Sequence, residues 1–303
     1  MWHPCFQSAV YFQRILQEPI SLLVKQVLYG VLLVAVPVMA GGCRGGDTGQ
    51  GEPTQGPQTD SSAMTRPGRD TSLSPMQASI VPTIEDDVAA LQELGVRLVR
   101  DHRGTVWSGV AVGLEITDAD LARLRGLPQL ESLEIADCPI TDAGLANLAG
   151  LTELQILYLS DVPITDRGLA HLGDLDRLTV LSLQNTKITG KGLVHLKDLT
   201  DLEVLNLSDT AVTDDALEHL GSLAELDTLA LEGTMVTDAG LVHCGPLDKL
   251  RVLNLNRCAV TDDGLENLLG LTNLRMLYAA ETKLTAENAE KFRLRMTSLA
   301  VQR

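Results

Sequence analysis

A pattern that recurs every 24 residues constrains this chain more than any other feature of its sequence. From Ile116 the chain can be written as seven lines of 24 without an insertion, and an eighth, incomplete line starts at Leu284. Seven positions of the line, numbers 1, 6, 9, 12, 15, 18 and 20, are apolar almost throughout. A unit this short cannot bury its own apolar face, so neighbouring units must stack into one continuous core, as in a solenoid.

Two spacings within each line predict two kinds of element. Leu169, Leu172 and Leu175 occupy positions 6, 9 and 12, and this spacing of three fits one side of a short helix. Leu181 and Leu183 differ by two, as residues on one face of a strand do. Each line is therefore predicted to form a short helix, a turn and a short strand. Seven strands at ~4.8 Å would give a parallel sheet roughly 35 Å long.

The strand segment itself carries a resemblance. Residues 202–210, LEVLNLSDT, match L-x-x-L-x-L-x-x-T/C and resemble a leucine-rich repeat. The lead-in I-T-D-x-G-L is similar to the bacterial cysteine-containing and GALA-like subtype, and also to the repeats of eukaryotic F-box adaptors. The resemblance covers residues 116–283. It implies an α/β horseshoe solenoid, with a parallel sheet on the concave face, short helices on the convex face and a protein ligand on the concave face.

Three polar positions of the line have predicted structural roles. Position 2 is Thr and position 3 is mostly Asp, which is typical of a helix N-cap followed by an acid at the positive end of the helix dipole. Position 23 holds Asn or Cys in many leucine-rich repeats, where these side chains form a ladder of hydrogen bonds along successive repeats. Here Thr hydroxyls supply part of that ladder and Val162 interrupts it; the position reads Cys138, Val162, Thr186, Thr210, Thr234, Cys258 and Thr282.

The segments that flank the repeats are predicted to be caps. Residues 84–115 form the N-terminal cap, with a helix from Glu85 to Leu94 and a strand pair from Val96 to Val112. Residues 284–303 form the C-terminal cap and are helical by propensity.

An export signal is predicted upstream of the caps. Residues 27–40, VLYGVLLVAVPVMA, are 14 uncharged and mostly apolar residues, the length of a signal-peptide core rather than of a membrane span. The Ala40-Gly41-Gly42-Cys43 sequence that follows resembles the lipobox of bacterial lipoproteins. That resemblance implies a signal peptide over residues 1–42 and a lipid on Cys43. Cleavage after Ala40, giving a secreted protein, and an uncleaved anchor remain the alternatives.

The expected location follows from this signal and from the segment after it. Residues 43–83 are rich in Gly, Pro, Ser, Thr and Gln, and are expected to form the lipidated cysteine and a disordered tether. We therefore expect a lipid-anchored, extracytoplasmic protein of the bacterial cell envelope.

The charge of the chain restricts its partners. Its formal net charge is −16, and residues 84–303 carry 19 basic and 35 acidic side chains. A folded region this acidic repels phosphate backbones, which argues against nucleic acid as a partner. A protein ligand is expected, and the oligomeric state is left open.

Two sets of side chains are candidates for function. Position 8 contains His171, His195, His219 and His243, which are expected to decorate the convex surface; a metal or pH-sensing column is the alternative. Positions 19 and 21 alternate with inward leucines and form a polar strip, with tyrosines as interface anchors. The predicted protein-binding residues are Tyr158, Ser182, Gln184, Asn206, Glu232, Asn254, Asn256 and Tyr278.

No catalytic, cofactor-binding or metal-binding motif accompanies these candidates. Position 22 adds a rim of carboxylates that could hold a cation or meet a basic partner, although a solvated rim is favoured. The inward cysteines Cys138, Cys244 and Cys258 are expected to be reduced core residues. The sequence thus predicts a noncatalytic interaction module without a cofactor. A structural spacer without a ligand and an F-box-like ubiquitin-ligase adaptor are the alternatives.

Overall fold

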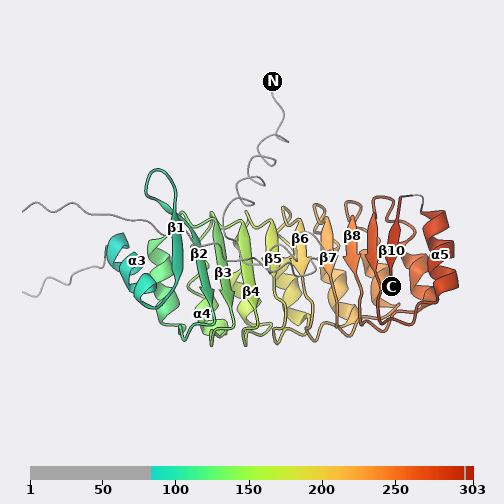
Figure 1. Cartoon of the computed structure of the whole chain (residues 1–303), viewed down its shortest axis with the longest axis horizontal. Coiled ribbons are helices and arrows are strands. Elements are labelled where there is room, and N and C mark those ends of the chain that lie inside the picture. The colour runs from blue at the N-terminus through green and yellow to red at the C-terminus, as the bar shows by residue number, and fades with distance from the viewer. Residues whose placement is uncertain (1–82, 297) are drawn as a thin grey trace, which may run out of the picture. The chain divides into compact units, whose positions relative to one another are not determined.

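The computed structural model describes residues 83–296 and 298–303, which lie in one compact unit, Val81–Arg303. Ten strands form a single open sheet, in which each strand pairs with its neighbours in chain order (Figure 1). The strands are β1 (Arg97–Arg100), β2 (Val106–Val112), β3 (Ser132–Ala136), β4 (Ile156–Ser160), β5 (Val180–Ser182), β6 (Val204–Asn206), β7 (Thr228–Ala230), β8 (Val252–Asn254), β9 (Met276–Tyr278) and β10 (Ala300–Gln302).

The register of the sheet repeats the period of the sequence. Leu181 pairs with Leu205, and the same row continues through Leu229, Leu253 and Leu277. Every parallel pair joins residues that are 24 apart, and only the β1–β2 pair is antiparallel among the described strands. Equivalent residues therefore lie side by side along the sheet, so each sequence position becomes a row across the molecule.

The helical side consists mostly of 3₁₀ turns. They are η1 (Asp120–Gly126), η2 (Gly168–His171), η3 (Lys191–Leu196), η4 (Asp214–Leu220), η5 (Gly240–Cys244) and η6 (Asp262–Leu268), with one short α-helix, α4 (Asp142–Leu145). A 3₁₀-helix has three residues per turn, so leucines three apart share one face. The strict spacing of positions 6, 9 and 12 explains why these segments are tighter than the α-helices that amphipathic patterns usually indicate.

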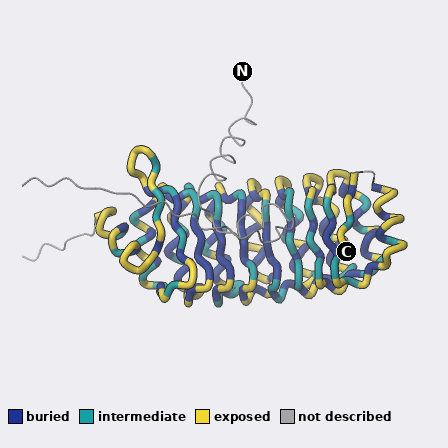
Figure 2. The backbone as a smooth tube through the Cα atoms, in the orientation of Figure 1, coloured by how far each residue is buried: buried dark blue, intermediate teal, exposed yellow. Residues whose placement is uncertain are grey.

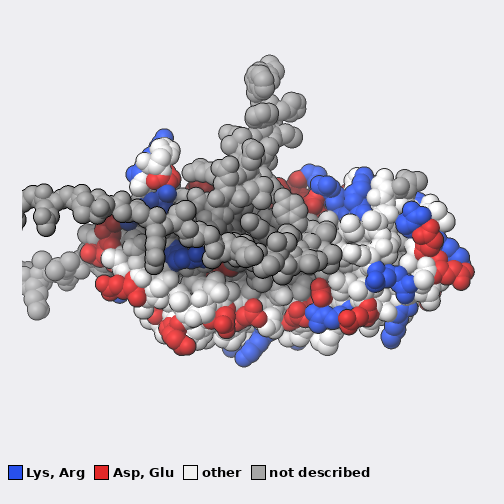
Figure 3. Space-filling model, in the orientation of Figure 1, with Lys and Arg blue, Asp and Glu red and all other residues white. Residues whose placement is uncertain are grey.

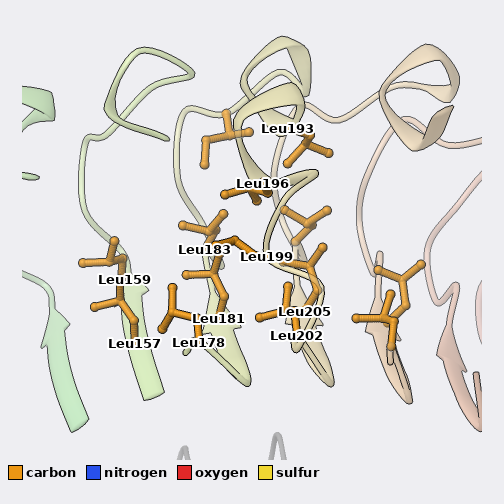
Figure 4. Close-up of a cluster of buried hydrophobic side chains, with 14 of the residues drawn as sticks. Leu157, Leu159, Leu178, Leu181, Leu183, Leu193, Leu196, Leu199, Leu202 and Leu205 are labelled. Carbon is orange, nitrogen blue, oxygen red and sulfur yellow. The ribbon is translucent and has the colours of Figure 1, made fainter. Parts of the chain in front are cut away.

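The core lies between the sheet and these turns (Figure 4). Leu193, Leu196 and Leu199 point from the helical side toward Leu181 and Leu205 of the strands, and all five are fully buried. Figure 2 shows the same pattern along the whole described backbone, with exposed residues concentrated at the turns. Cys138, Cys244 and Cys258 are buried free thiols within this core.

Both ends of the sheet extend the 24-residue register into the caps. Ser108 in β2 pairs with Ser132, and Ala300 in β10 pairs with Met276. The N-terminal helix, α3 (Ile84–Glu93), starts at a capping box formed by Thr83 and Asp86. The C-terminal cap contains α5 (Ala286–Arg295), as its propensity predicts, and also β10, which the sequence pattern does not reveal.

A contact between repeats gives position 3 a role that the sequence does not predict. Asp142 stands in the first turn of α4, as predicted, and it also binds the next repeat. Its Oδ1 accepts the Thr165 amide at 2.7 Å and its Oδ2 accepts the Thr165 hydroxyl at 2.6 Å. We call this arrangement the Thr–Asp clamp. Within residues 83–296, it joins Asp118–Thr141, Asp142–Thr165, Asp166–Thr189, Asp214–Thr237, Asp238–Thr261 and Asp262–Thr285.

The position-23 residues also bond differently from the expected ladder. The Thr186, Thr210 and Thr234 hydroxyls each donate to a carbonyl three residues earlier in the same repeat. Cys258 reaches back to the carbonyl of Leu231 in the preceding repeat at 3.0 Å. Val162, which has no such donor, is buried at this position. These hydroxyls therefore close single turns, and the Thr234 hydroxyl also contacts Cys258 Sγ of the next repeat at 3.6 Å, which is the part of the ladder that remains.

Every strand from β3 to β9 is followed by a residue with left-handed backbone at position 22. These residues are Asp137, Asp161, Asn185, Asp209, Gly233, Arg257 and Glu281. Asp, Asn and Gly tolerate positive φ best, which explains their frequency at this position. Arg257 and Glu281 have φ of 58° and 57°, so these two side chains are held in a conformation that their residue types rarely adopt.

Candidate functional site

The strand face, defined as positions 17, 19 and 21 of β3–β9, points away from the helical turns. Leucines at positions 18 and 20 fill the core, and alternation turns their neighbours to the opposite side. Position 17 contributes an apolar row that the polar-strip prediction omitted and that Thr228 of β7 interrupts. Val180 is buried in this row, and Ile156, Val204, Val252 and Met276 are partly buried. The strand face therefore combines an apolar row with two polar rows.

The predicted binding residues differ in their accessibility. Tyr158 keeps 6% of its surface exposed and Tyr278 keeps 9%, and Ser182 and Asn206 are also buried. Gln184, Glu232, Asn254 and Asn256 are partly exposed. The accessible polar groups of this set are thus concentrated from β7 to β9, with Gln184 following β5.

Burial also determines the ionisation of the two tyrosines. Burial raises the pKa of Tyr158 above its usual value, and the nearby Glu134 carboxylate raises this pKa further. Burial alone raises the pKa of Tyr278. A tyrosine is neutral at physiological pH at its usual pKa, and these shifts move both phenols further from ionisation.

Hydrogen bonds hold the asparagines of the strand face in place. Asn254 Oδ1 accepts the amide of Asn256 at 3.0 Å, and Asn254 Nδ2 donates to Glu232 Oε2 at 3.0 Å. Asn256 Oδ1 accepts the amide of Ala280 at 2.7 Å. Side chains fixed in this way lose little further entropy when they meet a ligand.

A charged bridge borders the strand face next to these asparagines. Arg257 donates to Asp209 Oδ1 at 2.7 Å and to Glu232 Oε1 at 3.2 Å. Its reach to Asp209, two repeats away, passes Gly233, where an added Cβ would lie 3.1 Å from the guanidinium. Contact with Asp209 raises the pKa of Arg257, and Glu232 adds to this effect. We call these three residues the Arg257 bridge.

The Arg257 bridge was not found by sequence reasoning, because its three residues stand at unequal spacings. The signal in the sequence that could have indicated the bridge is Gly233, because position 22 carries a larger side chain in every other line. The bridge also revises the predicted carboxylate rim, since Asp209 binds an arginine of the chain itself.

Several other charges at the edge of the strand face pair across one repeat. Arg177 pairs with Glu153, Lys249 with Glu225 and Arg251 with Asp227, each across one repeat. Acidic and basic side chains accordingly alternate along the lower rim in Figure 3.

The histidine column lies on the helical side. His195 is exposed, and His171, His219 and His243 are partly exposed. Within the described residues, no three His, Cys, Asp or Glu side chains are grouped so that they could hold a metal ion. The column has the exposure of a solvated surface row.

Cys43, the predicted signal peptide and the predicted tether lie outside the described residues. In the part of the chain that is described, no helix combines the length and apolarity needed to cross a bilayer.

Comparison with known proteins identifies the class of fold. Residues 127–149 and 249–269 match the family described as Leucine Rich repeat. The structure of internalin C2 from Listeria monocytogenes aligns with a TM-score of 0.54 and 24% identity, over 65% of this chain and 80% of that chain. Together with the 24-residue register of the sheet, these findings show that the chain folds as a leucine-rich repeat solenoid.

Two further structures align more weakly. A leucine-rich repeat protein from Leptospira interrogans aligns with a TM-score of 0.45 and 19% identity, over 60% of this chain and 51% of that chain. The plant peptide hormone receptor RGFR1 in complex with RGF2 aligns with a TM-score of 0.48 and 16% identity, over 68% of this chain and 36% of that chain. No curated protein sequence matches this chain.

Proposed function

We propose that this protein is a noncatalytic interaction module of the bacterial cell envelope that binds a protein ligand through its strand face. The observation that carries the proposal is the surface from β7 to β9. There, partly exposed Val252 pairs with Met276, and partly exposed Asn254 pairs with Tyr278, with Asn256 and Arg257 following at the rim. Apolar, aromatic and arginine side chains surrounded by fixed polar groups are the composition of protein-binding hot spots.

Ligand binding is tested by placing charge on the apolar row. The change Val252→Lys/Met276→Lys introduces two ammonium groups where a ligand would bury apolar surface, without removing a hydrogen bond of the strand face. We expect recovery of the ligand, measured by cross-linking of intact cells and quantitative mass spectrometry, to fall at least ~10-fold, because lost hot-spot contacts cost more than about 1.4 kcal/mol.

The helical side supplies the matched control for this experiment. Val194 and Val242 are 37% and 58% exposed on η3 and η5, so Val194→Lys/Val242→Lys adds the same charge to the opposite surface. This control should recover the ligand as well as the wild type does. Equal, diffuse recovery from all three proteins would instead favour a structural spacer without a specific ligand.

The proposed location depends on Cys43. Its preceding residues, Ala40-Gly41-Gly42, support cleavage before the cysteine and attachment of lipid to it. We expect intact-mass analysis of the mature protein to give an acylated N-terminus at Cys43, and Cys43→Ser to release the protein from the membrane fraction. An unacylated N-terminus at Gly41 would contradict lipid anchoring and favour secretion.

A further inference from the structure

One junction between repeats lacks the Thr–Asp clamp. Position 3 of the fourth line is Gly190 rather than Asp, so nothing in the preceding repeat accepts from Thr213. In the clamped repeats, the equivalent amides of Thr165 and Thr237 donate to a carboxylate at 2.7 Å. Thr213 is exposed and forms no side-chain cap, and η4 starts there without the bonds that the clamp provides.

The backbone at this junction differs from the backbone at the clamped junctions. Gly190 has φ of 103°, whereas the aspartates at the same position do not have left-handed backbone. A Cβ on Gly190 would overlap the Cβ of Ala216 in the next repeat. Position 5 is Gly in five of the six lines that follow a clamp aspartate, and it is Asn288 in the C-terminal cap. At Gly168, for example, a Cβ would lie 2.7 Å from Asp142 Oδ1. At this junction, Gly190 thus stands at position 3 and Ala216 at position 5 of the next line, where the clamped junctions on either side have Asp and Gly.

The Arg257 bridge crosses the same junction at the strand-face rim. Asp209 belongs to the repeat 188–211, Glu232 to the repeat 212–235 and Arg257 to the repeat 236–259. The bridge therefore connects both of these repeats to the repeat 236–259, through half-exposed ions that salt can screen. On the helical side, the Ser222 hydroxyl donates to the Lys197 carbonyl across the same junction at 2.7 Å. The sheet itself is continuous here, since Asn206 pairs with Ala230 across the junction.

We propose that the solenoid opens at the junction between residues 188–211 and 212–235, and that the Arg257 bridge holds this junction closed. The β6–β7 pairing acts as the hinge, and the corner that contains Thr213 separates when the bridge breaks. In a solenoid each repeat contacts only its neighbours, so one weak junction divides the molecule into two cooperative units.

Hydrogen exchange followed by mass spectrometry of the full-length protein tests this proposal. We expect residues 212–217 to have protection factors about tenfold lower than residues 164–169, 236–241 and 260–265, because the absent hydrogen bonds to a charged group are each worth more than about 1 kcal/mol. The change Arg257→Gln should lower protection of residues 212–217 by a further ~3-fold, the size of a surface ion-pair effect. High salt should act in the same direction on the wild type and have little effect on Arg257→Gln.

Arg177→Gln is the matched control, because Arg177 pairs with Glu153 across the clamped junction of Asp142 and Thr165. It should leave residues 164–169 as protected as in the wild type. Equal protection of residues 212–217 and 236–241 would overturn the proposed opening. Loss of protection spread over all repeats in Arg257→Gln would overturn the specific role of the bridge.

Discussion

Replacing Asp238 with alanine is expected to lower the free energy of unfolding by about 2–3 kcal/mol. The substitution removes the acceptor of the Thr261 amide, at 2.8 Å, and of the Thr261 hydroxyl, at 2.6 Å. Hydrogen bonds to a charged group contribute about 1.5–3 kcal/mol each, and the partial exposure of this corner lets water recover part of that loss. Urea unfolding followed by circular dichroism measures the change as a lower midpoint.

Asp263, which lies two residues after the clamped Thr261, provides the control for this prediction. It is exposed and its carboxylate forms no clamp, so Asp263→Ala should change stability by less than about 0.5 kcal/mol. Both variants remove one negative charge, which separates loss of the clamp from relief of charge repulsion. If Asp238→Ala matched Asp263→Ala, the clamp would contribute nothing measurable to the junction.

The features that repeat within one line were accessible from sequence. Periods of three and two predicted a helical turn and a strand, and the fixed line length predicted a parallel sheet in register. The local N-cap was predicted correctly, and Thr141, Thr261 and Thr285 form it. The clamp was missed because its two residues, such as Asp142 and Thr165, stand in different lines. A single line contains no information about which of its polar groups face the next line.

The candidate site was predicted only in outline. Alternation identified the strand face, but not that Tyr158 and Tyr278 are buried on it, since exposure depends on everything packed around a side chain. The Arg257 bridge depends on a missing side chain at Gly233, which leaves a path from Arg257 to Asp209. Pairs of this kind depend on distances in the folded chain, and they produce no regular spacing in the sequence.

Replacing Gly240 with alanine is expected to lower the free energy of unfolding by about 2–3 kcal/mol. A Cβ at this position would overlap Asp214 Oδ1 and lie 3.1 Å from both Asp214 Cα and Leu217 Cδ1. Because a backbone atom is among these contacts, the strain cannot be relieved by rotating one side chain, and overpacking of this kind costs about 1–3 kcal/mol. Gly270→Ala is the control, since a Cβ there meets nothing within 4 Å and should leave the urea midpoint nearly unchanged.

The double variant Asp214→Gly/Gly240→Ala separates this clash from a general intolerance of alanine. It recreates the natural pair Gly190 and Ala216, in which the preceding line has no clamp aspartate. Asp214→Gly removes the overlap with Oδ1 and leaves only the two contacts at 3.1 Å. We therefore expect the two changes to be non-additive by about 1–2 kcal/mol in a double-mutant cycle. Additive effects would mean that Gly240 is required by its own backbone rather than by the Asp214 side chain, and the proposed link between the clamp aspartate and the glycine at position 5 would then be wrong.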